Sequence, residues 1–296
     1  MLNKTNILAL VGGGKYPKFS KNKITIFDSH QDLIISQIRF NSNITRVKLR
    51  RDSIIGFIDN KIYILNINSL ETIDIIKIDK TKSPIYSISY FSNKLVISFP
   101  QYNNIGKLQI EKYFITSKNS KKEDTIIKTA HESKIIFISN SSDGTLIATG
   151  SEKGQYIRIF NAENGDLLAD LKKGKKPITW IAFERNNHFI GYSSNLGKAY
   201  IYDIKEINKL FNNNEEDKKE ENNNKKEMQN KNRIYKIKAK PFVRFKFEKN
   251  ECIIGFIEQN KFVIFTLEGK LYKISFDEKF KFCNLIDEFC ISIRKK

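Results

Sequence analysis

Three basic residues of the 296-residue chain have the type and spacing to hold an anion: Arg158, Lys172 and Lys173. Arg158 lies inside the apolar run YIRIF, where an arginine is costly to bury unless it meets an anion, water or a carboxylate. The two lysines are adjacent, so their side chains point to opposite sides of an extended backbone. Gly174 follows them and allows close approach to the backbone. This pattern favours binding of a phosphate-like anion, while a structural ion pair for Arg158 and a solvated loop for the lysines stay open as alternatives.

The sequence shows no pattern typical of catalysis or metal binding. The histidines His30, His131 and His188 do not have the spacing of metal ligands, and no nucleophile–base set is recognisable. The segment VGGGK (11–15) lacks the spacing of a phosphate loop, and no helical pattern follows it. We therefore expect a binding protein that is not an enzyme and has neither a metal nor a cofactor.

The net charge favours a polyanionic partner. Lys and Arg total 52 against 33 Asp and Glu, which gives a formal net charge of +19. Nucleic acid and the anionic face of a membrane both fit this balance, and the charge does not choose between them. A general bias toward lysine is a third explanation.

The cysteines and the N-terminal apolar run bear on the compartment. Cys252, Cys283 and Cys290 contain no C-x-x-C pair, so the sequence predicts neither a disulfide framework nor a zinc site and fits the reducing cytoplasm. The longest N-terminal apolar run, ILALV (7–11), is far too short for a signal peptide or a membrane span. Any membrane contact is expected to be peripheral.

Short strand-like runs recur along the chain and would position the basic residues. They are ITIFD (24–28), IYILN (62–66), KLQIE (107–111), YIRIFN (156–161), AYIYDI (199–204) and KFVIF (261–265). Their first residues are 38, 45, 49, 43 and 62 positions apart, and a polar insertion widens the last gap. A repeat of about 40 residues with several strands per unit is typical of WD-repeat propellers. We therefore predict an all-β, WD-repeat-type β-propeller with six visible blades of four strands and little helix.

One repeat unit can be divided completely into strands and turns. Strands at 134–139, 145–150, 155–160 and 166–171 are separated by the turns NSSDG, SEKG and NAENG. The Asp-Gly and Asn-Gly steps supply the positive φ that tight turns require. Arg158 therefore lies in the third strand of a blade, and Lys172 and Lys173 lie where the chain crosses to the next blade.

Residues 205–233 form a low-complexity insertion within the single propeller domain that we expect over residues 1–296. The insertion has 9 Asn, 8 Lys and Arg, and 7 Asp and Glu, so it cannot build a core and is expected to be disordered. Its near neutrality leaves almost all of the positive charge on the folded part. At its base, Ile207, Leu210 and Phe211 form an apolar patch suited to contact with a lipid interface.

Four stretches of the sequence resemble one known family. They are NILALVGGGKYPKF (6–19), RVKLRRDSIIGFIDNKIYILN (46–66), AHESKIIFISNSSDGTLIATGSEKGQYIRIF (130–160) and LLADLKKGKK (167–176). In this order, and across nearly the whole chain, they resemble the PROPPIN family of WD-repeat propellers, and they are most similar to the branch with an L-R-R-G signature. Family members have seven blades, whereas six are visible here and the family's first blade is absent from the match.

The resemblance implies a peripheral-membrane adaptor in autophagy or endosomal membrane traffic. PROPPINs bind phosphatidylinositol 3-phosphate and phosphatidylinositol 3,5-bisphosphate, so a cytoplasmic protein attached to autophagosomal, endosomal or other membranes with 3-phosphoinositides is expected. Autophagy proteins, such as a lipid-transfer protein, are the implied protein partners. The insertion matches the family's membrane-contacting loop, which lies between the last two strands of the sixth blade.

The resemblance also implies two basic pockets, one on each side of the signature, which reads Leu171-Lys172-Lys173-Gly174 here. The first pocket would contain His131, Thr149, Ser151, Gly154, Arg158 and Lys172. The second would contain Lys173, Gly174 and Ser194. Lysines in place of the family's arginines keep the charge but lose the planar two-pronged donor.

Two other functions remain open at the level of the sequence. The chain could be a protein-interaction scaffold without lipid binding, or a basic propeller that binds nucleic acid. The 12 Tyr and 22 Phe lie mostly at alternating strand positions, which is typical of core packing, and no nucleic-acid motif occurs. Nucleic acid is therefore the less favoured partner.

Overall fold

The computed structural model describes residues 5–80, 85–116, 119–153, 155–172, 177–206, 241–248, 251–277, 279 and 283–290. In this part of the chain, the regular structure consists of 23 strands and one helical turn at residues 204–206. The prediction of an all-β fold is confirmed.

The strands form six antiparallel sheets, each built from consecutive strands. The first sheet contains β1 (Ile7–Leu10), β2 (Lys23–Asp28) and β3 (Leu33–Arg39). The second contains β4 (Ile44–Leu49), β5 (Ser53–Ile58), β6 (Lys61–Asn66) and β7 (Thr72–Lys77). The third contains β8 (Ser87–Ile88), β9 (Leu95–Pro100), β10 (Lys107–Ile115) and β11 (Ser120–Thr129).

The remaining three sheets also have four strands each. The fourth sheet contains β12 (Ile135–Asn140), β13 (Leu146–Ser151), β14 (Tyr156–Asn161) and β15 (Leu167–Lys172). The fifth contains β16 (Ile178–Phe183), β17 (Phe189–Ser194), β18 (Lys198–Asp203) and β19 (Val243–Lys246). The sixth contains β20 (Cys252–Glu258), β21 (Lys261–Thr266), β22 (Lys270–Phe276) and β23 (Cys283–Cys290).

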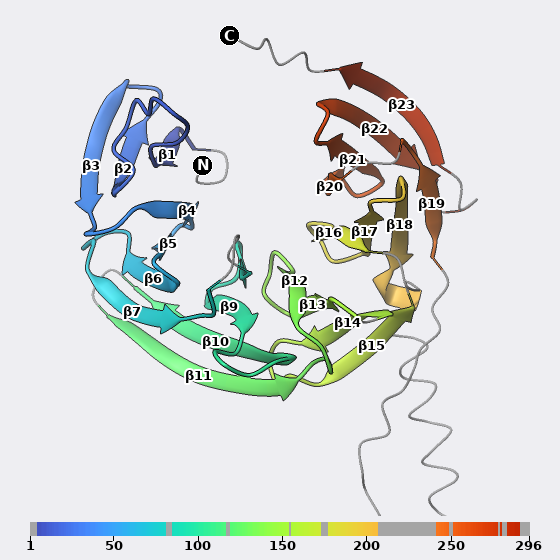
Figure 1. Cartoon of the computed structure of the whole chain (residues 1–296), viewed down its shortest axis with the longest axis horizontal. Helices are drawn as coiled ribbons and strands as arrows, with labels where there is room; N and C mark the ends of the chain where they lie inside the picture. Colours follow the sequence, from blue (N-terminus) through green and yellow to red (C-terminus); the bar gives the residue numbers. More distant parts are fainter. Residues whose placement is uncertain are drawn as a thin grey trace, which may run out of the picture.

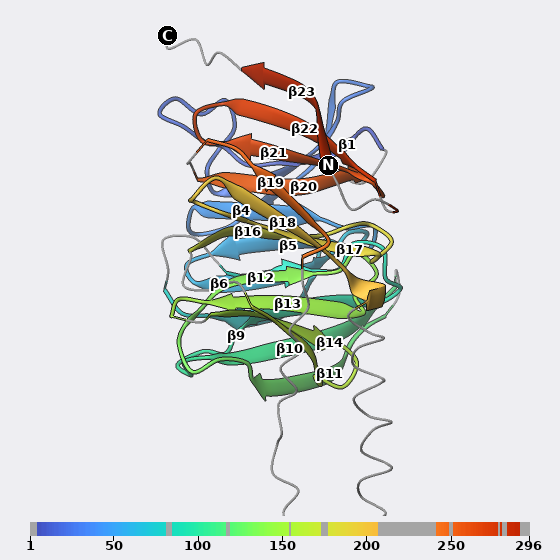
Figure 2. The same ribbon diagram turned by 90° about the vertical axis from the view of Figure 1, so that its right-hand side faces the viewer.

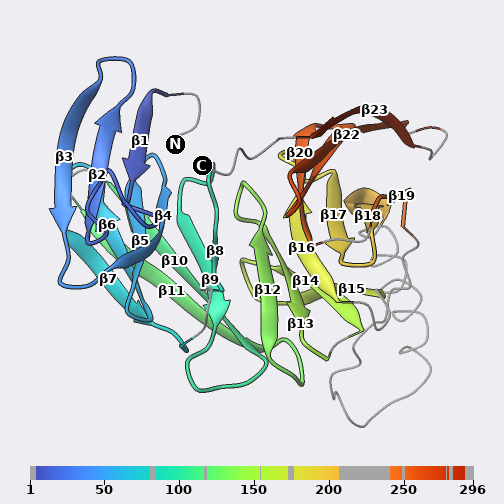
Figure 3. The same cartoon turned by 45° about the horizontal axis from the view of Figure 1, so that its top comes forward.

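The sheets follow one another around an arc, as the blades of a propeller do (Figure 1, Figure 3). In the fourth sheet, β12 lies toward the centre of the arc and β15 at its rim (Figure 1). Seen from the side, the strands run across the thickness of the arc (Figure 2). This architecture confirms the β-propeller that the repeat spacing predicted.

The first sheet departs from the prediction, because it has three strands rather than four in the described part. Before Ile44, the described chain offers only three strand-forming runs. The stretch at 12–22, rich in Gly and Lys, forms the connection between β1 and β2. By contrast, in the repeat unit at 134–171, for which the sequence predicted four strands, all four are present and each is shifted by one residue, as β12 and β15 show. Shifts of this size are within the variation of strand-end assignment.

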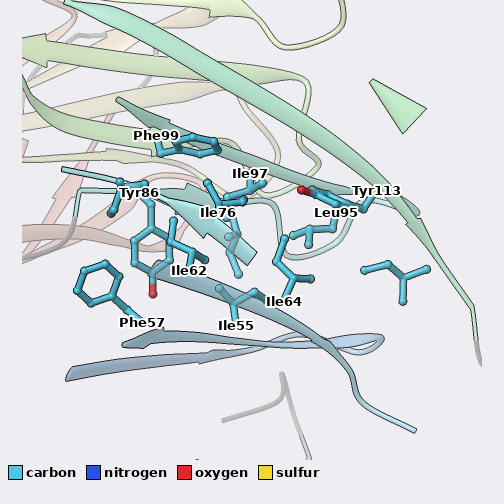
Figure 4. Close-up of a cluster of buried hydrophobic side chains, with 13 residues drawn as sticks. Ile55, Phe57, Ile62, Ile64, Ile76, Tyr86, Leu95, Ile97, Phe99 and Tyr113 are labelled. Carbon is cyan, nitrogen blue, oxygen red and sulfur yellow. The ribbon is translucent and has the colours of Figure 1, made fainter. Parts of the chain in front are cut away.

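One hydrophobic cluster lies between each pair of neighbouring sheets. Figure 4 shows the cluster between the second and third sheets, where Ile55 and Ile64 pack with Leu95 and Ile97. Successive residues of a strand face opposite sides, so one strand contributes to two clusters. On β9, Leu95 and Ile97 join this cluster while Val96 joins the cluster shared with the fourth sheet. The period-two apolar pattern therefore holds the sheets together.

The antiparallel order fixes which connections share an end of the strands. In each four-stranded sheet, the second-to-third connection and the links to neighbouring sheets lie at one end, which we call the linking end. The first-to-second and third-to-fourth connections lie at the opposite end. Residues 130–134, 152–153, 155 and 195–197 are therefore at the linking end. The predicted insertion falls between β18 and β19, the last two strands of their sheet, and so begins and ends at the opposite end; its residues 207–233 lie outside the described residues.

Candidate functional site

His131 and Thr149 form the buried base of the candidate site. His131 lies in the link between β11 and β12, and Thr149 lies in β13. His131 Nε2 and Thr149 Oγ1 are 2.9 Å apart, and the two residues are 5% and 0% exposed. Thr149 is also the register partner of Arg158 on β14. The fold thus brings together three residues of the predicted first pocket that are 9 to 27 positions apart in sequence.

Arg158 forms an ion pair with Asp170, its register partner on β15. Arg158 Nε donates to Asp170 Oδ1 at 3.0 Å, and Arg158 Nη1 donates to the carbonyl oxygen of Ala130. Ile157 and Ile159 pack against the fifth sheet, so the residue between them points to the side of the third sheet. The structural ion pair that the sequence left open is therefore present. Neither contact uses Nη2, which stays available as a donor.

A cavity of about 840 Å³, which we call the His131 cavity, opens beside this group at the linking end. Its lining includes His131, Ser151 and Arg158, so three residues of the predicted first pocket share it. The Ser151 hydroxyl is buried and has no hydrogen-bond partner among the described residues. Because buried hydroxyls are normally satisfied, this oxygen is a place for a ligand atom or a water.

The lining also contains residues that the sequence did not predict: Lys134, Lys153, Gln155 and Tyr156. They adjoin the predicted residues in AHESK and SEKGQY, and this proximity was the only signal available in the sequence. The two lysines add positive charge to the lining, which Glu132 and Glu152 balance in formal charge, so that Arg158 supplies the excess positive charge of the lining. The cavity therefore combines cationic groups with neutral donors, and this combination suits an anion that has hydroxyl groups.

Lys172 is the last residue of β15, and its register partner on β14 is Tyr156. The backbone of Lys172 therefore adjoins the wall of the His131 cavity. Its side chain lies outside the described residues, as do the remaining predicted residues Gly154, Lys173, Gly174, Ile207, Leu210 and Phe211.

Ser194 lies apart from the His131 cavity, in β17 of the fifth sheet. It is 0% exposed, and its hydroxyl donates to the carbonyl oxygen of Lys198 at 3.4 Å. It shares the linking end with the other predicted residues, but the structure does not bring it together with His131. The second pocket, which also needs Lys173 and Gly174, stays a prediction.

Among the residues that the structure describes, no three His, Cys, Asp or Glu side chains are grouped as metal ligands would be. No helix among those residues combines the length and the apolar character that crossing a membrane requires. The VGGGK segment lies in the connection between β1 and β2, so no helix follows it there.

Comparison with curated proteins finds similarity to autophagy-related propellers. Autophagy-related protein 18e of Arabidopsis thaliana is 24% identical over 282 residues, which cover 94% of this chain and 71% of that protein. SVP1-like protein 2 of Saccharomyces cerevisiae is 30% identical over 228 residues, which cover 70% of this chain and 51% of that protein. The chain thus spans between about half and 71% of the length of these two relatives.

Solved structures agree in fold. Kluyveromyces lactis Hsv2 gives a TM-score of 0.71 at 17% identity, covering 98% of this chain and 84% of that chain. KlAtg21, solved in complex with the coiled-coil of AgAtg16, gives a TM-score of 0.72 at 18% identity, covering 99% and 84%. At these identities the likeness establishes the propeller fold. The family model described as PROPPIN matches residues 15–277, which make up most of the 296-residue chain. The chain therefore belongs to the PROPPIN family.

Proposed function

We propose that the protein binds membranes carrying 3-phosphorylated phosphoinositides and acts there as a peripheral adaptor in autophagy. The family and its autophagy-related members support the membrane-traffic role. The proposed preference for phosphatidylinositol 3-phosphate or 3,5-bisphosphate rests on the resemblance of Leu171–Gly174 to the signature of the family. A cytoplasmic protein that attaches to autophagosomal or endosomal membranes follows from the same proposal.

The observation that carries the proposal is the His131 cavity. A head-group phosphate needs several donors at once, and the cavity offers Arg158 Nη2, the unpartnered Ser151 hydroxyl and the two lysines at its wall. Hydrogen bonds to a charged phosphate are roughly twice as strong as neutral ones. The inositol hydroxyls, in turn, suit the polar groups of Gln155 and Tyr156.

Lys172 and Lys173 add a contribution of long-range charge. Each basic residue near an anionic membrane contributes about 1 kcal/mol. Lysine is a point charge rather than a fork, so we expect weaker discrimination between head groups than the family's arginines would give. If Lys173 and Ser194 form the second pocket, two weak contacts on one rigid propeller add through avidity, provided that both reach the same bilayer.

As an adaptor, the protein would bind partner proteins and would not itself be an enzyme. KlAtg21 was solved with the coiled-coil of AgAtg16, and we extend to this chain the binding of a coiled-coil partner protein by the propeller. A scaffold that works without lipid, and a nucleic-acid binder, are the alternatives that the experiment must separate.

The experiment compares binding of the full chain to phosphatidylcholine vesicles that carry no inositide, 3-phosphorylated inositides or 4-phosphorylated inositides. Lys172→Ala combined with Lys173→Ala removes about 2 kcal/mol, so partition onto 3-phosphoinositide vesicles should fall about 30-fold. Lys172→Arg with Lys173→Arg should keep or strengthen binding.

The matched control is Lys18→Ala with Lys21→Ala, which removes the same charge from an exposed connection of the first sheet. Equal loss in both alanine pairs would mean that binding follows total charge, and equal affinity for nucleic acid would then favour the nucleic-acid alternative. Absence of vesicle binding by the unaltered chain would favour the scaffold.

A further inference from the structure

The connection between β9 and β10, residues 101–106, presents an apolar side chain at the mouth of the His131 cavity. Ile105 is 77% exposed, which makes it the most exposed aliphatic residue in the described part of the chain. Ile105 lines the cavity together with His131 and Arg158. A single exposed apolar residue is common on protein surfaces, so its position and its support decide whether this one has a function.

The connection is tied directly to the backbone of the candidate site. The carbonyl oxygen of Gly106 accepts hydrogen bonds from the backbone N–H groups of Ala130 and His131, both at 2.9 Å. Gly106 has φ of 75°, and a Cβ at this position would lie 1.8 Å from the carbonyl oxygen of His131. Glycine is therefore required for this close approach, which places Ile105 beside the cavity.

Further contacts hold the connection to its own sheet and to the second sheet. Within it, Gln101 N–H donates to the Lys107 carbonyl oxygen at 3.0 Å. Asn103 N–H donates to Asp79 Oδ1 at 3.0 Å, and the Lys77 ammonium group lies 4.3 Å from the centre of the Tyr102 ring. A loop held at this many points loses little conformational entropy when its tip is buried in a new environment.

We propose that Ile105 inserts into the lipid interface next to the bound head group, so that the His131 cavity and this loop engage the bilayer together. The inference rests on the proposed phosphoinositide function and adds an apolar contact to it. The chemistry fits a lipid surface, because a polar cavity with three cationic side chains lies directly beside a rigid aliphatic tip. Lys134 lines both the His131 cavity and a smaller cavity, and Ile105 lines the same two cavities, so a cation adjoins the apolar tip.

The placement also separates this contact from the predicted contact of the insertion. The insertion leaves the fold at the opposite end of the strands from the His131 cavity. A six-residue strand is about 20 Å long, so the insertion would have to extend past that length to reach the bilayer that the cavity faces. Ile105 is already at the linking end and needs no such extension.

The first test measures partition of the full chain onto phosphatidylcholine vesicles with and without phosphatidylinositol 3-phosphate. Ile105→Ser should weaken partition about tenfold, because most of an aliphatic side chain is no longer withdrawn from water. Binding of a water-soluble, short-chain form of the same lipid should be unchanged. The matched control is Ile257→Ser, an exposed isoleucine toward the opposite end of the strands, which should bind as the unaltered chain does.

The second test locates the residue in the bilayer. The chain contains one Trp, Trp180, so Trp180→Phe with Ile105→Trp gives a single fluorophore at the loop tip. Brominated acyl chains in phosphatidylinositol 3-phosphate vesicles should quench its emission, and soluble quenchers should lose access to it.

The outcomes separate the two proposals. If the unaltered chain ignores phosphatidylinositol 3-phosphate vesicles, the proposed function fails and the Ile105 contact fails with it. If the chain binds but Ile105→Ser partitions equally well, or the tryptophan is not quenched by brominated chains, lipid insertion is refuted while head-group binding stands. In that last case Ile105 would be available to contact a partner protein.

Discussion

The ion pair between Arg158 and Asp170 leads to a prediction that separates stability from lipid binding. The side chain of Asp170 is 0% exposed and that of Arg158 is 19% exposed, with Nε and Oδ1 3.0 Å apart. Removing one partner of a buried pair leaves an uncompensated charge and typically costs about 3–5 kcal/mol. Because Arg158 keeps some contact with water, we expect the lower value, about 3 kcal/mol, for Asp170→Ala and for Arg158→Ala.

Thermal unfolding followed by circular dichroism measures this loss. For a domain of this size, 1 kcal/mol shifts the melting temperature by about 2–4 °C, so each single variant should melt about 6–12 °C lower. Arg158→Met combined with Asp170→Leu replaces both charges by apolar groups and should recover most of the loss. The corresponding double-mutant cycle should give a coupling energy of about 4–5 kcal/mol, because the two single losses sum to about 6 kcal/mol while the double variant should lose only about 1–2 kcal/mol.

The same double variant tests the head-group role of Arg158. It should be folded and yet bind phosphatidylinositol 3-phosphate vesicles more weakly, because Nη2 is gone from the His131 cavity. A melting temperature of Asp170→Ala equal to that of the unaltered chain would refute the energetic reasoning. Full vesicle binding by the folded double variant would leave Arg158 with a structural role only.

Two other predictions concern Lys48, on the first strand of the second sheet, and the insertion. Burial and then the nearby Arg46 lower the pKa of Lys48 to about 8 from 10.5, so the unfolded chain holds more protons between these values and stability should rise as the pH increases through this window. Lys48→Met should be more stable than the unaltered chain at neutral pH, and this difference in stability should shrink toward pH 10.5. Urea titrations at several pH values measure the difference. A difference that does not change with pH would contradict the lowered pKa of Lys48. Leu210→Asp with Phe211→Asp should weaken vesicle partition while leaving soluble head-group binding intact; unchanged partition in co-sedimentation would remove the insertion from the mechanism.

The local pattern of the sequence determined the strands and their turns. In the unit from 134 to 171, alternating apolar residues and the Asp-Gly and Asn-Gly steps placed all four strands to within one residue. These features are local. Successive side chains of a strand alternate between its two faces, and the turn residues set the backbone angle φ at only one or two positions. The prediction of four strands in every sheet was wrong for the first sheet, because the described chain before Ile44 contains only three strand-forming runs.

The charge and type of the basic residues were equally visible in the sequence. Arg158 lies in the third strand of its sheet as predicted, whereas Lys172, which was predicted just after the fourth strand, is the last residue of β15. The residue that meets Arg158 was not identified. Asp170 lies in LLADLKK, within the same predicted unit, but only the register between β14 and β15 shows that the two residues are opposite each other.

The tertiary structure alone decided how the predicted residues are grouped. It joined His131, Ser151 and Arg158 at one cavity, placed Ser194 in the next sheet and set Ile105, which has no distinguishing pattern in sequence, at the cavity mouth. The physical reason is that a propeller site is built from connections of different sheets. Which connections meet depends on the direction of each strand and on the packing of whole sheets, whereas the residues within a single strand report only which of its faces is apolar.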